Sequence, residues 1–417
     1  MSPPFSESKG NTLLEHAALC RKLQINVQRN RKQDHTQLLD EAAAAFRYED
    51  CRDEYWNPEE FSLLYGTALW DEASLSQRVA LNHLYWVAYY SQIISAEIAT
   101  IYFNQTSAAG LYAQEDFRTV CDMLDLESAQ ERAHISAFKT IADQVEAELF
   151  GERLFSYPMR SPFTETMIFA DTNALKRRWK QLQLQAFGLL SAGNTFLACQ
   201  YFTVRGLRTL NGKLVQHKLS RYYQTHADPD HAPIPAKISY YHFMDESFHF
   251  NSSTLLSHEV VNCLKPPTQF ESTVANLGIW GCQKDHYHFS AAINGIFWYD
   301  PAIYSTIYRL LRSPLFGLEI EEAKAMLHRC FAQESDGLHR SYQTHQEAME
   351  SYKAYLTPIS YAGTRNRDMA LMAKNSIATY LNIQRRSLRR VLPSLEEDLI
   401  NQRTVGKNPV LQSGTAL

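Results

Sequence analysis

Long runs of apolar residues with helical spacing dominate the first two thirds of the chain. Asp171 has the residue type and place of an N-cap for the third run, and Asn211 with Gly212 predicts its end. A stretch with three prolines at 226–236 predicts the connection to the fourth run. The four predicted long helices lie at about 73–106, 113–149, 172–210 and 238–264.

Shorter helical patterns surround these four long runs. Residues 12–50 predict one or two surface helices, and alternating patterns typical of strands are not evident in the sequence. We therefore predict an all-α protein, as a single domain over 12–403, with a four-helix core at about 73–265. Residues 1–11 are expected to be disordered and 404–417 to form a flexible tail. The C-terminal helices are predicted within 269–396, at 269–283, 301–312, 318–334, 337–356, 365–382 and 385–396.

Composition is that of a protein with a large core. The chain has 417 residues, of which 45% are hydrophobic, and a net charge of −4. This charge argues against a nucleic-acid or membrane-surface binder. The seven cysteines show no Cys-x-x-Cys spacing, and the N-terminus has no apolar signal core, so we expect free thiols in the cytoplasm.

Two apolar stretches are long enough to be considered as membrane spans. The stretch at 86–103 carries Glu97 near its middle, and the stretch at 186–203 carries Asn194 and Gln200. Charged and amide side chains are costly in a bilayer. Both stretches are therefore interpreted as helices of the protein core, and no membrane association is expected.

Two Glu-x-x-His motifs provide the candidate chemistry. Glu131 and His134 lie in the second long helix, and Glu246 and His249 lie in the fourth. Residues at i and i+3 share one face of a helix, so each motif directs a carboxylate and an imidazole to one point. His242 lies one turn before Glu246 and adds a second imidazole to that face. Carboxylate and imidazole ligands together suit iron or manganese.

Glu97 strengthens this interpretation, because it is a lone charge in the apolar sequence SQIISAEIATIYF. A buried carboxylate is costly unless it is paired or binds a metal. The order Glu, Glu-x-x-His, His-x3-Glu-x-x-His is the order that a dinuclear metal site in a ferritin-like four-helix bundle requires. The alternative is that these residues are exposed side chains that contact each other along their helices.

Asp245 precedes Glu246 and lies about 100° away around the helix, so it cannot face the same point. In this architecture a neighbouring Asp often accepts the second N–H of a ligating imidazole. We expect Asp245 to accept a hydrogen bond from His134. The alternative is a solvated carboxylate on the helix surface.

With these residues the chain resembles the aminobenzoate N-oxygenase family of ferritin-like di-iron enzymes, over about residues 75–265. Members of that family carry an additional histidine one turn before the last Glu-x-x-His, as His242 does here. The resemblance implies two iron ions, with manganese as an alternative in one position, and O2 activation. The implied ligands are Glu97, Glu131, His134, His242, Glu246 and His249.

The departure from that family lies in the third long helix, where the family has a ligating Glu. Here no Glu occurs from 166 to 245, and the family's position falls near Ser191, Ala192, Gly193 and Asn194. We expect these four small residues to line an open, halide-binding position. Plain helix packing and a misplacement by a turn or two are the alternatives. A neutral ligand from Gln183, Gln185, Asn194 or Gln200 is another.

A missing carboxylate is also the feature that makes room for halide in mononuclear iron halogenases. The same logic in a di-iron bundle resembles the cyanobacterial dimetal-carboxylate halogenases of the cylindrocyclophane type. That resemblance implies halogenation of an unactivated C–H, with a halide, a fatty acyl substrate that an acyl carrier protein can carry, and an electron donor. The alternatives are a di-iron N-oxygenase or hydroxylase, and a non-enzymatic helical binding protein.

Two further features are weaker. His286 and His288 are two residues apart, which places them on different faces of a helix, and we interpret them as surface or loop residues. Residues 385–390 form a basic helix face, which could dock an acidic carrier protein or simply be solvated.

Overall fold

A computed structural model describes residues 12–155, 174–226, 228–289 and 302–395. The described residues form helices and connecting segments and contain no strand, which confirms the predicted all-α class. The predicted disorder of residues 1–11, the predicted tail at 404–417 and the predicted cap at Asp171 lie outside these ranges.

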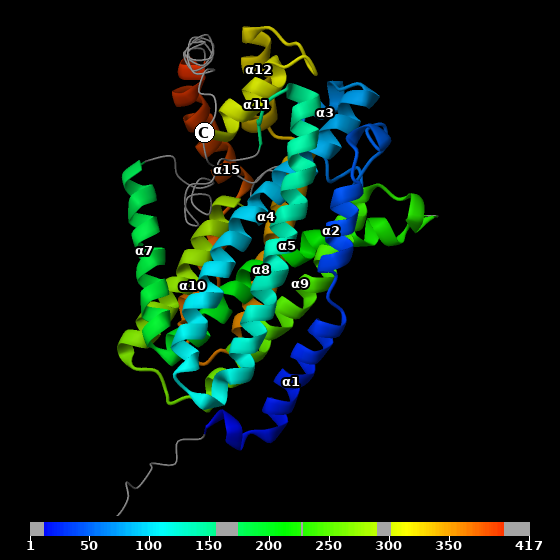
Figure 1. The fold of residues 1–417 in the computed structure, drawn as a ribbon. Coiled ribbons are helices and arrows are strands. Elements are labelled where there is room, and N and C mark those ends of the chain that lie inside the picture. The colour runs from blue at the N-terminus through cyan, green and yellow to red at the C-terminus, as the bar shows by residue number, and fades with distance from the viewer. Residues whose placement is uncertain (1–11, 156–173, 227, 290–301, 396–417) are drawn as a thin grey trace, which may run out of the picture.

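Four long helices form the core, as predicted (Figure 1). They are α4 (Leu75–Tyr112), α5 (Arg118–Phe150), α8 (Thr195–Gln224) and α9 (Ile234–His258). Helices α4 and α5 pack as one pair and α8 and α9 as another, and the pairs meet through contacts of α4 with α8 and of α5 with α9. One face of each of these four helices is thus directed to the interior of the core.

Local sequence signals explain several ends of these helices. Ser74 and Gln77 form a capping box at the start of α4. Helix α5 ends at Gly151, which adopts the left-handed conformation with φ 69° that glycine accommodates best. Pro235 lies in the first turn of α9, where a missing N–H costs no helical hydrogen bond.

The third long helix differs from the prediction. A break at Asn194 divides the predicted single helix into α7 (Ala174–Gly193) and α8. The side chain of Asn194 accepts a hydrogen bond from the backbone of Leu197 and so caps α8. The predicted stop at Asn211 and Gly212 is wrong, because α8 continues to Gln224 along α9.

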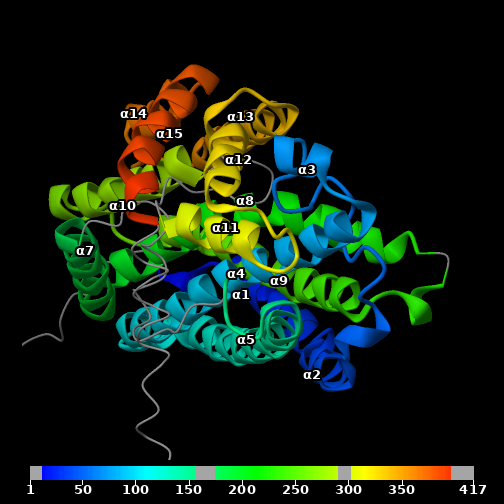
Figure 2. The ribbon, with the colours of Figure 1, turned by 90° about the horizontal axis from the view of Figure 1, so that it is seen from above.

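The remaining helices cover this core on two sides (Figure 2). Helices α1 (Ala17–Lys32) and α2 (Thr36–Ala45) pack against α5 and α9. Helices α10 and α13 pack against α8, whereas α7 packs against α4 and α8. The other bounds are α3 (Ala68–Glu72), α10 (Gln269–Phe289), α11 (Ala302–Arg312), α12 (Ile320–Ala332), α13 (Asp336–Leu356), α14 (Thr364–Arg367) and α15 (Ile377–Val391).

The C-terminal helices are partly repositioned relative to the sequence pattern. The predicted helix at 365–382 is wrong, because α14 ends at Arg367 and a short 3-10 turn at Met372–Lys374 follows. Ser376 then caps α15, which continues without a break across 383–384, where the prediction separated two helices. Capping by Ser376 therefore sets the helix start more strongly than the apolar pattern does.

Candidate metal centre

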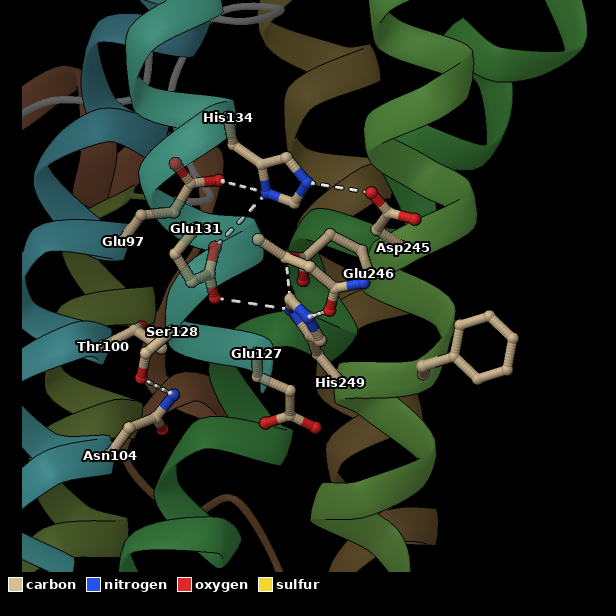
Figure 3. Close-up of polar contacts among 12 residues, drawn as sticks. Glu97, Thr100, Asn104, Glu127, Ser128, Glu131, His134, Asp245, Glu246 and His249 are labelled. Carbon is tan, nitrogen blue, oxygen red and sulfur yellow. Dashed lines mark hydrogen bonds and ion pairs between the residues drawn. The ribbon is translucent and has the colours of Figure 1, made fainter. Parts of the chain in front are cut away.

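The six predicted ligands meet in the interior of the four-helix core. All of them except His242 are labelled in Figure 3. Helix α4 provides Glu97, α5 provides Glu131 and His134, and α9 provides His242, Glu246 and His249. Their ligand atoms form two groups, in each of which all atoms lie within 4.8 Å of one another. The first group is Glu97, His134, His242 and Glu246, and the second is Glu131, Glu246 and His249.

In the first group, Oε1 of Glu97 lies between two imidazoles. It is 3.1 Å from Nε2 of His242 and 3.5 Å from Nδ1 of His134. Oε1 of Glu246 approaches the same place, 3.7 Å from Nε2 of His242. One carboxylate from α4 and one from α9 thus face two imidazoles.

In the second group, Nδ1 of His249 faces two carboxylates. It lies 2.9 Å from Oε1 of Glu246 and 3.3 Å from Oε1 of Glu131. The other oxygen of Glu131 lies 3.4 Å from Nδ1 of His134, in the first group. Glu131 and Glu246 therefore both face the two groups, which is the arrangement of bridging carboxylates in a dinuclear site.

The chemistry of these side chains fits two bound metal ions. Oε2 of Glu97, Oε2 of Glu131 and Nδ1 of His134 are buried and have no hydrogen-bond partner among the described residues. Buried polar atoms in folded proteins are rarely left without a partner. Phe138 and Tyr90 pack edge-on against the His242 ring and shield it from water. Metal ions bound at the two groups would give these three buried atoms the partners that they lack.

The charges at the site depend on burial and on mutual contacts. Burial raises the pKa of Glu97 well above its ordinary value, and nearby Glu131 raises it further. Burial also acts to raise the pKa of Glu131, but His249 and His134 outweigh it and hold that pKa at about 2. Burial acts to lower the pKa of His134 and His249, yet the surrounding carboxylates raise both well above the ordinary value. Protons on these two imidazoles balance the carboxylates, and bound metal would displace them.

Hydrogen bonds hold the outward nitrogens of two imidazoles. Nε2 of His134 on α5 donates to Oδ2 of Asp245 on α9, 3.2 Å away, as expected from the sequence. Nε2 of His249 on α9 donates to Oε1 of Gln130 on α5, 3.0 Å away. Each acceptor immediately precedes the Glu of its own Glu-x-x-His motif and serves the imidazole of the opposite helix. Both imidazoles therefore direct Nδ1 inward, where the carboxylates lie.

A buried ion pair that the sequence pattern did not reveal lies beside the second group. Glu127, one turn before Glu131, accepts hydrogen bonds from Arg205 on α8 and from Ser252 on α9. Arg205 also donates to the main-chain oxygen of His249. This pair connects α5, α8 and α9 directly beside the candidate ligands. Its only signal in the sequence is a charged residue on an apolar helix face.

The structure places Ser191, Ala192, Gly193 and Asn194 away from the six candidate ligands. They form the junction of α7 and α8, where the main-chain oxygen of Ser191 packs tightly against Gly110. Gly110 is thirteen residues after Glu97 on α4, or roughly 20 Å along a helix. The expectation that these four residues line the open position does not agree with this placement. It rested on aligning the family's ligating Glu with this part of the predicted third helix.

The proposed neutral ligands are also placed elsewhere. Gln183 and Gln185 are exposed on α7. Asn194 caps α8 and donates a hydrogen bond to Glu271. Gln200 is buried close to the hydroxyl of Tyr361, whose pKa it acts to lower by hydrogen bonding.

Among its described residues, α8 supplies no carboxylate or imidazole to either group. Gly212 follows Arg205 by seven residues and therefore lies on the same helix face. The atoms nearest to a methyl group at Gly212 would belong to the side chain of Gln216 and the hydroxyl of Tyr89, at 3.7–4.0 Å. Burial raises the pKa of Tyr89 well above its ordinary value, and the charge of Glu246 adds a small contribution in the same direction. The face of α8 that carries Arg205 therefore has room for a methyl group at Gly212, in ordinary contact with Gln216 and Tyr89.

His286 differs from its predicted surface or loop position. It lies in α10, is buried, and forms a hydrogen bond with the hydroxyl of Tyr352 on α13. Burial lowers its pKa to about 3, so it is a neutral imidazole in the helix packing. The side chain of His288 is not described.

Comparisons with known proteins give one match. A family model described as "Acyl halogenase CylC-like" matches residues 18–392. No curated protein and no solved structure matches the chain. In the part of the chain that the structure describes, no helix is both long and apolar enough to cross a membrane.

Proposed function

The chain belongs to the CylC-like acyl halogenase family, and from this premise we propose how it acts. We propose a non-haem di-iron enzyme that uses O2 to install chloride or bromide at an unactivated C–H of a fatty acyl substrate. Membership of an enzyme family argues against the non-enzymatic binding protein that the sequence left open.

The observation that carries this proposal is the unequal contribution of the four core helices. Helices α4, α5 and α9 supply carboxylates and imidazoles to the two groups, and α8 supplies none among its described residues. The first group contains two imidazoles, whereas the second contains only His249. A metal ion in the second group would therefore keep more coordination positions for external ligands, which supports a halide there.

Charge supports the same conclusion. Two ferrous ions carry four positive charges, whereas Glu97, Glu131 and Glu246 together carry three negative charges when ionised. A bound halide would supply the fourth negative charge without a fourth protein carboxylate. We propose that it lies on the α8 side of the centre, near Gly212, where α8 has no side chain opposite the hydroxyl of Tyr89.

The residues of the site have distinct proposed roles. Glu131 and Glu246 would hold both ions, because each carboxylate faces both groups. Asp245 and Gln130 orient His134 and His249 by accepting their outward N–H groups. Bound iron would supply the activation of O2 that removes hydrogen from the substrate C–H. The surrounding apolar rings exclude water, which would compete with the halide.

The exposed surface of α15 is compatible with a substrate that is bound to a carrier protein. Arg385, Arg386, Arg389 and Arg390 are exposed together on α15. An acidic acyl carrier protein would be attracted to such a face. We propose that the fatty acyl chain is presented on such a carrier, and that a separate electron donor reduces the iron.

The test is to load the full chain with ferrous iron under anaerobic conditions, with bromide or without it. Metal content and X-ray absorption at the iron edge are then measured. Two irons per chain with a bromide scattering shell support the proposal. Two irons with only nitrogen and oxygen neighbours in saturating bromide would favour a di-iron N-oxygenase or hydroxylase. Absence of bound metal would overturn the proposed di-iron centre.

A further inference from the structure

Helix α1 and the residues that lead into α2 lie outside the four-helix core but reach its polar interior. Helix α1 packs along α5 and α9, the two helices that carry the Glu-x-x-His motifs (Figure 1). Its Asn26 and Asn30 are buried despite their polar amides. Buried amides require partners, and those partners lie beside the candidate metal ligands.

His35, at the start of α2, contacts Asp245. Nδ1 of His35 lies 2.9 Å from Oδ1 of Asp245, and its main-chain N–H donates to the same oxygen at 3.2 Å. The other oxygen of Asp245 accepts from His134. The Asp245 side chain is fully buried, whereas 18% of the His35 side chain is exposed. His35 therefore lies between Asp245 and solvent and fixes the direction of its carboxylate.

Asn30 likewise contacts Gln130, the acceptor for His249. Nδ2 of Asn30 donates to Oε1 of Gln130 at 3.1 Å, and Nε2 of Gln130 donates back to Oδ1 of Asn30 at 2.8 Å. Oε1 of Gln130 also accepts from His249. The paired amides restrain Gln130 with its oxygen toward the imidazole. Two residues five positions apart thus each reach one candidate ligand through one intermediate side chain.

These contacts matter because an imidazole has two distinct nitrogens. It can bind a metal through Nδ1 only if its proton is on Nε2. A carboxylate oxygen or an amide oxygen facing Nε2 favours that tautomer, because each accepts a hydrogen bond and cannot donate one. An acceptor that is free to rotate or is replaced by water would hold the ring less firmly.

We propose that the N-terminal segment of α1 and α2 is a positioning element of the metal centre. His35 acts through Asp245 on His134, and Asn30 acts through Gln130 on His249. Together they hold both imidazoles with Nδ1 free for metal. This inference rests on the proposed metal centre, and the experiment below separates the failure of one from the failure of the other.

The test uses the full chain loaded with Co(II), a paramagnetic probe that shifts the proton resonances of its ligands. The exchangeable N–H resonances of the ligating imidazoles are recorded by NMR in water. Release of Co(II) to an excess of chelator is followed separately. His35→Phe keeps a ring that can stack on Tyr241, as His35 does, but removes the Nδ1 donor. Asn30→Leu keeps a similar size and removes both amide hydrogen bonds.

Each variant is expected to affect one imidazole. His35→Phe should accelerate solvent exchange of the His134 N–H at least about tenfold and leave that of His249 unchanged. Asn30→Leu should have the opposite selectivity. Both should release Co(II) faster, by about 10-fold, which is the lower end of the affinity loss seen when a direct hydrogen-bond partner of a ligand is removed. His35→Asn returns a donor near the position of Nδ1 and should restore the slow exchange.

Asn26→Leu is the matched control. Asn26 lies on the same helix, and its amide donates to Ser252, which contacts Glu127 and none of the imidazoles. It should leave both N–H resonances and Co(II) release unchanged. If His35→Phe and Asn30→Leu behave like Asn26→Leu, or if both resonances change together in each variant, the positioning role is wrong. If the unmodified chain binds no Co(II), the metal centre itself is wrong.

Discussion

Glu246 and His249 form an ion pair one helical turn apart, with Oε1 of Glu246 2.9 Å from Nδ1 of His249. The same oxygen lies 3.7 Å from Nε2 of His242, in the other group of candidate ligands. Glu246 is thus a member of both groups, whereas His242 is a member of one. This difference predicts unequal effects of removing the two side chains.

Glu246→Ala should abolish stoichiometric binding of both irons, because each ion loses a ligand and the two ions lose a common bridge. His242→Ala should reduce the iron content from two ions per chain to about one. The measurement is iron content after anaerobic loading and desalting, beside the unmodified chain. Equal losses in the two variants would contradict the assignment of Glu246 as the shared ligand.

The second prediction concerns the side of the centre that faces α8. Gly212→Glu would place a carboxylate on the α8 side of the centre, and it should keep two irons bound while removing the bromide scattering shell. The expected reason is that the new carboxylate supplies the charge and the ligand that the halide supplies otherwise. Halogenated product should fall at least tenfold.

Gly212→Gln is the control for the bulk of the new side chain, because it has nearly the same size without the charge. It should retain more bromide than Gly212→Glu. Retention of the full bromide shell in Gly212→Glu would show that the open coordination position is not beside Gly212.

The clustering of the candidate ligands could be predicted from the sequence because their signal is local. Glu131 with His134 and Glu246 with His249 share a helix face by spacing alone, and Glu97 is conspicuous in an apolar helix. The structure brings all of them together. Asp245 was found in the same way, since its place next to Glu246 directs it to the neighbouring helix.

The sequence pattern did not identify the residues whose role depends on packing between distant segments. Asn30 and His35 lie in helices that the pattern describes as surface helices, and only the contact with α5 and α9 buries Asn30. The break at Asn194 was missed because four small residues were interpreted as helix interior rather than as a stop and a cap. Conversely, Gly212 was interpreted as a stop, although packing of α8 along α9 carries the helix through it.

The third prediction concerns the ion pair of Arg205 and Glu127. Both side chains are buried, at 5% and 0% exposure. Arg205→Met should lower the free energy of unfolding by about 3–5 kcal/mol, because it leaves Glu127 buried without its partner. Urea unfolding monitored by circular dichroism measures the change.

The double variant Arg205→Met with Glu127→Gln removes both charges and should recover a large part of that loss. The pair is therefore tested as a pair, not as two separate residues. A single Arg205→Met variant that loses less than about 1 kcal/mol would mean that the ion pair contributes little to stability.

The last prediction concerns His83 and the pH dependence of stability. His83 on α4 is buried, stacks on Trp56 with ring centroids 3.9 Å apart, and donates from Nε2 to the main-chain oxygen of Glu54 at 2.8 Å. Its Nδ1 lies 3.0 Å from the hydroxyl of Tyr48 and accepts from it. Burial lowers the pKa of His83 from 6.5 to about 4, so the folded protein holds a neutral ring.

The direction in which stability changes with pH follows from the number of protons that the folded and the unfolded chain bind. In the unfolded chain His83 takes up a proton below about pH 6.5, whereas in the folded protein it does so only near pH 4. The stability associated with His83 is therefore complete above pH 6.5 and is lost as the pH falls from 6.5 toward 4. Between pH 7.5 and pH 5.0 this loss should be roughly 2 kcal/mol.

His83→Gln keeps a polar side chain that does not titrate, and it isolates this contribution. The variant is expected to be less stable than the unmodified chain at pH 7.5, because it cannot repeat the stacking and both hydrogen bonds. Its further loss on going to pH 5.0 should be smaller than that of the unmodified chain by roughly the same 2 kcal/mol. Parallel pH dependences in the two proteins would mean that the His83 ring titrates normally in the folded state, contrary to its buried contacts with Trp56 and Tyr48.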